Sequence, residues 1–164
     1  MQDFVHLHVH TQYSLLDGQA SVARLVDKAM KNGMKGIAVT DHGNMFGIKE
    51  FTNYVNKKNS GPKGEVKDLK KRIAGIEAGT IECEDKEAEI AACKAKIVEA
   101  ENKLFKPIIG CEMYVARRTM DLKEGKPDQS GYHLIVLAKN ETGYHNLIKL
   151  VSHAWTRGYY MRPR

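Results

Sequence analysis

Three histidines alternate with aliphatic residues near the start of the chain, in the run Val5-His6-Leu7-His8-Val9-His10. In a β-strand the two-residue period places all three imidazoles on one face. A lone histidine is more often structural, but three in register indicate a metal site, because imidazole is a common ligand of transition metals. The polar segment that follows is predicted to be a loop at the strand end, and Asp17 in it can return over the histidines.

Further imidazoles and carboxylates occur at later predicted strands. Asp41 and His42 follow an apolar run, Glu112 lies inside another, and His133 lies in a third. A buried glutamate needs a partner or a metal, whereas Asp41 could instead cap a helix and His133 could be a core histidine bonded to backbone. Together these ligand types favour Zn²⁺, Mn²⁺ or Fe²⁺ in a multinuclear site of the kind that hydrolyses phosphate esters.

The elements that would position these residues alternate between strands and helices. Buried apolar runs followed by helical periods predict an α/β fold with a parallel sheet, either a barrel or a doubly wound sheet. About four βα units are expected, with strands over residues 4–9, 36–40, 107–116 and 132–138 and helices over 21–32, 45–57 and the segment around 144–155. Ser21 is the predicted N-cap of the first helix, and Gly33 follows its end.

Residues 65–105 interrupt this alternation, after a turn signal over residues 59–64. Two apolar seams of three- and four-residue spacing predict an inserted antiparallel helical hairpin that serves docking or spacing. A single interrupted helix is the alternative, because Ala78-Gly79-Thr80 is a weak turn signal. Residues 65–103 hold ten acidic and eight basic side chains, so the rest of the chain carries a net charge of +8. This basic remainder suits a polyanionic partner, although a generic basic surface would look the same.

Composition restricts the class of protein. A chain of 164 residues with 42% hydrophobic and 28% charged side chains is typical of one folded domain. It has neither a signal-peptide pattern nor an apolar run of the ~18 residues that a membrane helix requires, so we expect a cytoplasmic protein without a membrane partner. Its three cysteines lack the C-x-x-C spacing, which argues against a disulfide framework or a thiolate zinc site.

At the same residues the chain resembles the PHP (polymerase and histidinol phosphatase) superfamily, through His8-Val9-His10-Thr11, Thr40-Asp41-His42 and Gly110-Cys111-Glu112. Longer phrases resemble one branch, the start of bacterial DNA polymerase III alpha subunits. These are residues 6–18, residues 40–47 and Leu137-Ala138-Lys139-Asn140-Glu141-Thr142-Gly143-Tyr144. Apart from the helical insert, the resemblance covers the whole chain.

The resemblance implies the N-terminal part of a distorted (βα)7 barrel with up to three divalent metals. By motif position the metal ligands and catalytic residues would be His8, His10, Asp17, His42, Glu112 and His133. His6 and Asp41 would support these ligands without binding metal. Residues 1–164 would form a partial PHP domain, with the family's last ligands, including an Asp-x-His pair, and the polymerase carboxylates downstream of Arg164.

The implied function is that of a DNA-directed DNA polymerase, a nucleotidyltransferase that uses Mg²⁺ in DNA replication, with a PHP site acting as a 3′-to-5′ proofreading exonuclease. The implied partners are DNA, the remainder of the alpha subunit and other replisome subunits. One alternative is a non-catalytic, metal-stabilised scaffold domain, and a free histidinol-phosphatase-type phosphoesterase is another. Because four βα units cannot close a barrel, we expect the isolated chain to self-associate or to be marginally stable, and to show little or no exonuclease activity.

Overall fold

The computed structural model describes residues 4–129 and 131–164, and the chain divides into two compact units. The first unit joins Met1–Tyr54 to Lys106–Arg164, and the second is Val55–Phe105. Helix α2 (Ile48–Lys58) spans the boundary. Residues 1–3 and 130 of the predicted partial domain lie outside the described residues.

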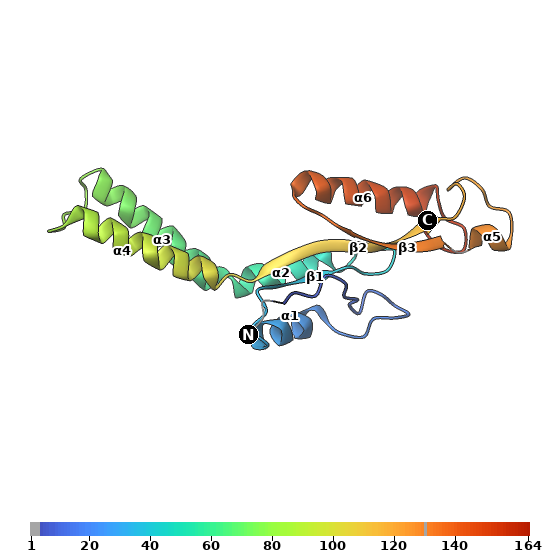
Figure 1. Cartoon of the computed structure of the whole chain (residues 1–164), viewed down its shortest axis with the longest axis horizontal. Coiled ribbons are helices and arrows are strands. Elements are labelled where there is room, and N and C mark those ends of the chain that lie inside the picture. Colours follow the sequence, from blue (N-terminus) through green and yellow to red (C-terminus); the bar gives the residue numbers. More distant parts are fainter. Residues whose placement is uncertain (1–3, 130) are drawn as a thin grey trace. The chain divides into compact units, whose positions relative to one another are not determined.

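A three-stranded sheet of order β1-β2-β3 forms the centre of the first unit (Figure 1). Strand β1 (Gly36–Val39) is fully buried and runs parallel to β2 (Lys106–Ala116). Strand β3 (Gly131–Leu137) pairs with the far side of β2 in the antiparallel direction. The sheet is therefore mixed, within the mixed α/β class that the sequence predicts.

The strand predicted over residues 4–9 is not formed. This segment lies extended beside β1, where the Ala38 amide donates to the His6 carbonyl at 2.9 Å and the Thr40 amide donates to the Val9 carbonyl at 2.9 Å. Between these two bonds the N-terminal segment advances by three residues, from His6 to Val9, whereas its partner advances by two, from Ala38 to Thr40. In a regular ladder both strands advance equally. The extra residue, with a bend at Leu7, therefore breaks the two-residue alternation after His6.

The predicted succession of four parallel βα units is also wrong, because β2 and β3 are antiparallel neighbours. Antiparallel strands need no crossover helix. The connecting residues 117–130 accordingly contain only the short helix α5 (Lys126–Gln129) among those that the structure describes. The three strands predicted over residues 36–40, 107–116 and 132–138 are present. Strands β1 and β2 are parallel, as predicted, but β3 runs in the opposite direction.

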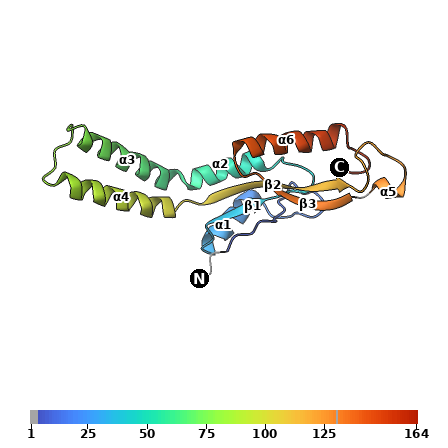
Figure 2. The ribbon, with the colours of Figure 1, turned by 45° about the horizontal axis from the view of Figure 1, so that its top comes forward.

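Helices on both sides of the sheet complete the core of the first unit. Helix α1 (Val22–Lys31) follows Ser21 and ends before Gly33, whose φ of 75° is left-handed, as predicted. Helix α6 (Glu141–Thr156) begins where the Asn140 side chain accepts the Gly143 amide at 2.9 Å. Figure 2 shows α6 along one side of β2 and β3 and α1 on the other side of the sheet.

The second unit contains α3 (Ser60–Glu77) and α4 (Lys86–Asn102), which lie side by side and run in opposite directions (Figures 1 and 2). Helix α3 already includes most of the predicted turn over residues 59–64. Pro62 is tolerated there because it lies in the first helical turn, where an amide has no intrahelical partner. Gly79, with φ 74°, lies in the connection between the two helices. None of the described helices is both long and apolar enough to cross a membrane.

Candidate metal centre

His42, which follows the end of β1, and Glu112, in the middle of β2, lie side by side. The parallel pairing continues past β1, because the Glu112 amide donates to the Asp41 carbonyl at 3.1 Å and the Gly43 amide donates to the Glu112 carbonyl at 2.8 Å. His42 and Glu112 are therefore paired at the backbone. The segment with His8 and His10 is joined to the same place by the Val9 amide, which donates to Thr40 Oγ1 at 2.9 Å.

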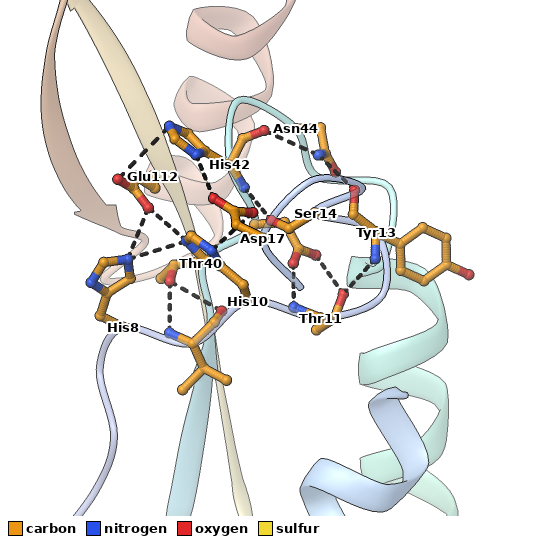
Figure 3. Close-up of polar contacts among 12 residues, drawn as sticks. His8, His10, Thr11, Tyr13, Ser14, Asp17, Thr40, His42, Asn44 and Glu112 are labelled. Atoms are coloured by element: carbon orange, nitrogen blue, oxygen red, sulfur yellow. Dashed lines mark hydrogen bonds and ion pairs between the residues drawn. The ribbon is translucent and has the colours of Figure 1, made fainter. Parts of the chain in front are cut away.

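Glu112 is the centre of the cluster (Figure 3). Its buried carboxylate lies 2.9 Å from His8 Nε2 and 2.6 Å from His10 Nε2 through Oε2. Its other oxygen, Oε1, lies 2.7 Å from His133 Nδ1 and 3.8 Å from His42 Nε2. A single carboxylate therefore faces four imidazoles, two on each oxygen.

These atoms form two groups that could each hold an ion and that share Glu112. One group is His8, His10 and Glu112, the other is His42, Glu112 and His133, and within each the ligand atoms lie within 4.8 Å of one another. His8 Nε2 and His10 Nε2 approach to 3.2 Å. His42 Nε2 is buried and has no hydrogen-bond partner among the described residues. A buried polar atom without a hydrogen bond is costly, so this nitrogen fits the role of a metal ligand.

Asp17 contacts the opposite nitrogens of two of these rings. Asp17 Oδ1 lies 3.2 Å from His10 Nδ1, and Asp17 Oδ2 lies 2.9 Å from His42 Nδ1. A carboxylate on Nδ1 fixes the ring so that Nε2 faces the metal position, the usual arrangement around metal-binding histidines. The role of Asp17 as a direct ligand stays a prediction, and in this geometry Asp17 belongs to neither group of three.

Asp41 and His6 are both predicted to support the ligands, but the structure places the two side chains in different surroundings. Asp41 is buried and accepts two bonds from Thr11, from the amide at 2.6 Å and from Oγ1 at 2.8 Å, which holds the loop after His10. The His6 ring instead contacts the Phe4 ring, at 4.7 Å between centroids. His6 is thus not brought to the cluster, because the break in alternation separates it from His8 and His10.

The charges of the site shift the pKa values of its carboxyl groups. Burial alone would raise the pKa of Glu112, but hydrogen bonds from His8, His10 and His133 and the charge of His42 lower it. Burial would likewise raise the pKa of Asp17, and its hydrogen bond with His42 and the charges of His10 and His42 lower it. Burial raises the pKa of Asp41 despite its bonds from Thr11. Both carboxylates that face imidazoles are therefore held in the charged form that binds cations.

Sequence reasoning missed three side chains that hold His42 or the adjacent Gly43. Ser14 Oγ accepts the His42 amide at 2.8 Å, and the Tyr114 ring stacks on the His42 ring at 4.3 Å. Trp155 Nε1 donates to the carbonyl of Gly43 at 2.7 Å. Tyr114 could have been found from the sequence, since it follows Glu112 by two residues and shares its strand face. Ser14 and Trp155 carry no comparable signal, because chain folding alone brings them to His42 and Gly43.

The family model for the PHP domain matches residues 6–98 and 86–164. The chain is 41% identical over 164 residues to the DNA polymerase III subunit alpha of Borreliella burgdorferi, covering 98% of this chain and 10% of that protein. It is 40% identical over 162 residues to the subunit of the same name in Treponema pallidum, with the same coverage of 98% and 10%. Identity with the Aquifex aeolicus subunit is 32% over 169 residues, covering 99% of this chain and 11% of that protein. The chain thus spans about a tenth of the length of these relatives.

Proposed function

The chain belongs to the PHP domain family. We propose that it is part of the metal-binding PHP domain of a bacterial replicative DNA polymerase, the alpha subunit of DNA polymerase III. It would act in DNA replication, in the cytoplasm, as part of a nucleotidyltransferase. Its partners would be DNA, the remainder of the subunit and other replisome subunits. Residues 65–105 would be an inserted helical hairpin within the N-terminal part of a distorted (βα)7 barrel, in which β2 and β3 are antiparallel. The support for the polymerase assignment is the similarity over nearly the whole chain to relatives of that name.

We further propose that the cluster around Glu112 is a phosphoesterase site that removes nucleotides from a DNA 3′ end. The observation that carries this proposal is the sharing of one buried carboxylate by two groups of imidazoles, with His42 Nε2 left without a hydrogen bond among the described residues. Two divalent ions, of zinc, manganese or iron, would supply positive charge that acidifies an attacking water and stabilises phosphoryl oxygens. The ligands would be His8, His10, Asp17, His42, Glu112 and His133.

The chain's own residues would keep the site in its geometry. Asp17 orients two imidazoles through their Nδ1 atoms. Asp41 and Ser14 fix the backbone of the loop that carries Asp17, and Tyr114 holds the ring plane of His42. Rigid support of this kind matters because misplacement of a catalytic group by about 1 Å can cost ~10²-fold in rate.

The test is an exonuclease assay on the polymerase subunit that carries this segment, with Glu112→Gln as the variant and DNA synthesis as the control activity. We expect release of nucleoside monophosphates from single-stranded 3′ ends, loss of that release in Glu112→Gln or after chelation, and retained DNA synthesis in Glu112→Gln. Bound metal without any release would leave the non-catalytic scaffold as the function. Unchanged release in Glu112→Gln would place the exonuclease elsewhere in the subunit.

A further inference from the structure

An open groove of about 660 Å³ lies beside the metal centre. Its lining includes His42, Phe46, Tyr114, Trp155, Tyr159 and Arg162. Several of its side chains are apolar and unusually exposed, with Phe46 at 70% and Met161 at 67%. Exposed apolar surface of this kind, gathered in a concave site, marks a binding surface.

The groove opens directly onto the candidate ligands. A smaller hollow of about 260 Å³ shares His42, Tyr114 and Arg162 with it and reaches Asp17 and Ser14. His42 thus presents Nε2 to the ligand cluster while its ring, stacked on Tyr114, lines the groove. A molecule that places a phosphate at the ligands can extend its neighbouring part into this groove.

The charge of the groove favours an anion with an aromatic part. Arg162 is its one charged side chain apart from the titratable His42, and no carboxylate lines it among the described residues. The Arg162 guanidinium lies 5.1 Å from the centroid of the Tyr114 ring and donates to the Tyr114 hydroxyl at 3.1 Å. Trp155 and Tyr159 stack on each other with centroids 5.6 Å apart. Arginine beside flat aromatic faces is the combination with which proteins bind single-stranded nucleic acids.

The segment that supplies Arg162 is fixed to the rest of the unit. The Tyr160 amide donates to the Arg162 carbonyl at 3.1 Å, and Met161 between them adopts a left-handed φ of 62°. Arg164 is buried and donates to the carbonyls of Gly158 and Asp128. A non-glycine residue keeps a left-handed conformation only where its surroundings hold it there, so the groove wall is preformed.

We propose that this groove is a nucleobase subsite that stacks the unpaired terminal base of a single-stranded DNA while Arg162 binds an adjacent phosphate. The inference rests on the proposed phosphoesterase function and adds its specificity: an unpaired base can enter the groove, whereas a base stacked inside a duplex cannot. The site would therefore act preferentially on frayed or mispaired ends.

The single tryptophan of the chain, Trp155, lines the groove and reports on its occupancy. The measurement is quenching of its fluorescence on titration with an eight-residue oligothymidylate, and with an abasic oligomer of the same length. Stacking predicts quenching by the base-bearing oligomer and roughly 5- to 150-fold weaker binding of the abasic one, because base stacking on aromatic side chains contributes that much. Inorganic phosphate should leave the emission unchanged.

Two variants and a control separate the base from the phosphate. Phe46→Ala should weaken binding of the base-bearing oligomer several-fold and leave the abasic one unchanged, whereas Arg162→Gln should weaken both. The matched control is Arg117→Gln, because Arg117 lies over the exposed Tyr132 ring at 5.5 Å, outside the groove. Circular dichroism of each variant checks that it is folded.

Metal content measured on the same samples distinguishes this inference from the proposed function. Bound metal with equal affinity for the two oligomers, or with no quenching, overturns the subsite and leaves the phosphoesterase proposal standing. Concentration-dependent self-association that changes Trp155 emission without a response to oligomers would also overturn it, since a second copy of the chain would then be the occupant.

Discussion

At the scale of single residues, the site depends on Glu112 more than on any histidine. Its carboxylate touches His8, His10 and His133 and faces His42, so it links the two groups of candidate ligands. The histidines are not equivalent, because His6 contacts Phe4 instead of the cluster. A histidine is therefore a candidate ligand here because of its position relative to Glu112, and not because of its residue type alone.

Replacing His8 and His6 separately tests this distinction. His8→Ala removes a nitrogen 2.9 Å from Glu112 Oε2 and should weaken binding of at least one ion by more than ~100-fold, since even partners outside the ligand set typically cost about 10–100-fold. His6→Ala should change affinity by less than about tenfold. Elemental analysis and competition with a chelating dye measure both. Equal losses in the two variants would contradict the assignment.

Asp128 provides a pH-dependent contribution to stability away from the metal centre. It is buried, and the hydrogen bond from Arg118, together with the one from the Glu124 amide, lowers its pKa below the ordinary 3.8. A lowered folded-state pKa stabilises the protein above the unfolded value, and that stabilisation is lost as the pH falls through the folded value. The melting temperature of Asp128→Asn should be below that of the parent chain at neutral pH, and the gap should close as the pH falls below 3.8.

The matched control is Asp121→Asn, which breaks the exposed pair of Asp121 with Arg157. Exposed ion pairs contribute little to stability, so this change should move the melting temperature only slightly at any pH. If the difference in melting temperature between Asp128→Asn and the parent chain does not vary with pH, lost packing and not lost charge is its cause.

At the scale of elements, the α3–α4 pair depends on a few specific contacts. Asn59 is buried, and its side chain donates to the Phe105 carbonyl at 2.8 Å and accepts the Phe105 amide at 2.9 Å. These two bonds join the residue before α3 to the residue three positions after α4. The start of α3 and the end of α4 are thereby held close together, so the chain enters and exits the helix pair at neighbouring positions.

Asn59→Ala should lower the free energy of unfolding by about 1–3 kcal/mol, because it leaves buried backbone groups of Phe105 without partners. Asn56→Ala is the control, since Asn56 is exposed and accepts a hydrogen bond from the exposed Lys63 ammonium, and it should stay within about 0.5 kcal/mol. Urea denaturation measures both. Similar values for the two variants would show that the double hydrogen bond is unimportant.

Replacement of residues 61–103 by a short Gly/Ser linker should leave metal content unchanged. The reason is that all candidate ligands lie in the first unit, and that Asn59 and Phe105 are already within hydrogen-bond distance. Elemental analysis and circular dichroism of the shortened chain are the measurements. Failure of the shortened chain to fold would mean that α3 and α4 contribute to the core of the first unit.

At the scale of the whole molecule, apolar surface remains exposed on the sheet. In the described part of the chain β3 pairs only with β2, and Tyr132 and Leu134 on it are 63% and 54% exposed. A strand edge with unpaired backbone groups and apolar side chains recruits other chains. The 164-residue chain is therefore expected to associate through β3.

Leu134→Lys should shift the sedimentation coefficient toward that of a monomer, because a lysine on an edge strand opposes edge-to-edge pairing. Leu150→Lys is the control: Leu150 is 52% exposed, but it lies on α6, where the backbone groups are already paired. Metal content should be unchanged in both. A monomeric parent chain, or an equal effect of the two variants, would contradict association through β3.

The sequence by itself determined the positions of most elements and the residue types of the site. Helix α1 and strand β2 lie where their periodicities predict, because apolar spacing and capping act over a few residues. The imidazoles and carboxylates could likewise be recognised as metal-binding types from their spacing along the chain. Both kinds of information are local in the chain.

Only the tertiary structure decided how these parts meet. The direction of β3 depends on pairing with β2 across the connection 117–130, and the break between His6 and Val9 depends on pairing with β1. The same holds for Asp17 facing Nδ1 atoms and for Arg162 lying beside Tyr114. Such contacts join residues far apart in sequence, and their free energy depends on surfaces that exist only after the chain has folded, so no local pattern encodes them.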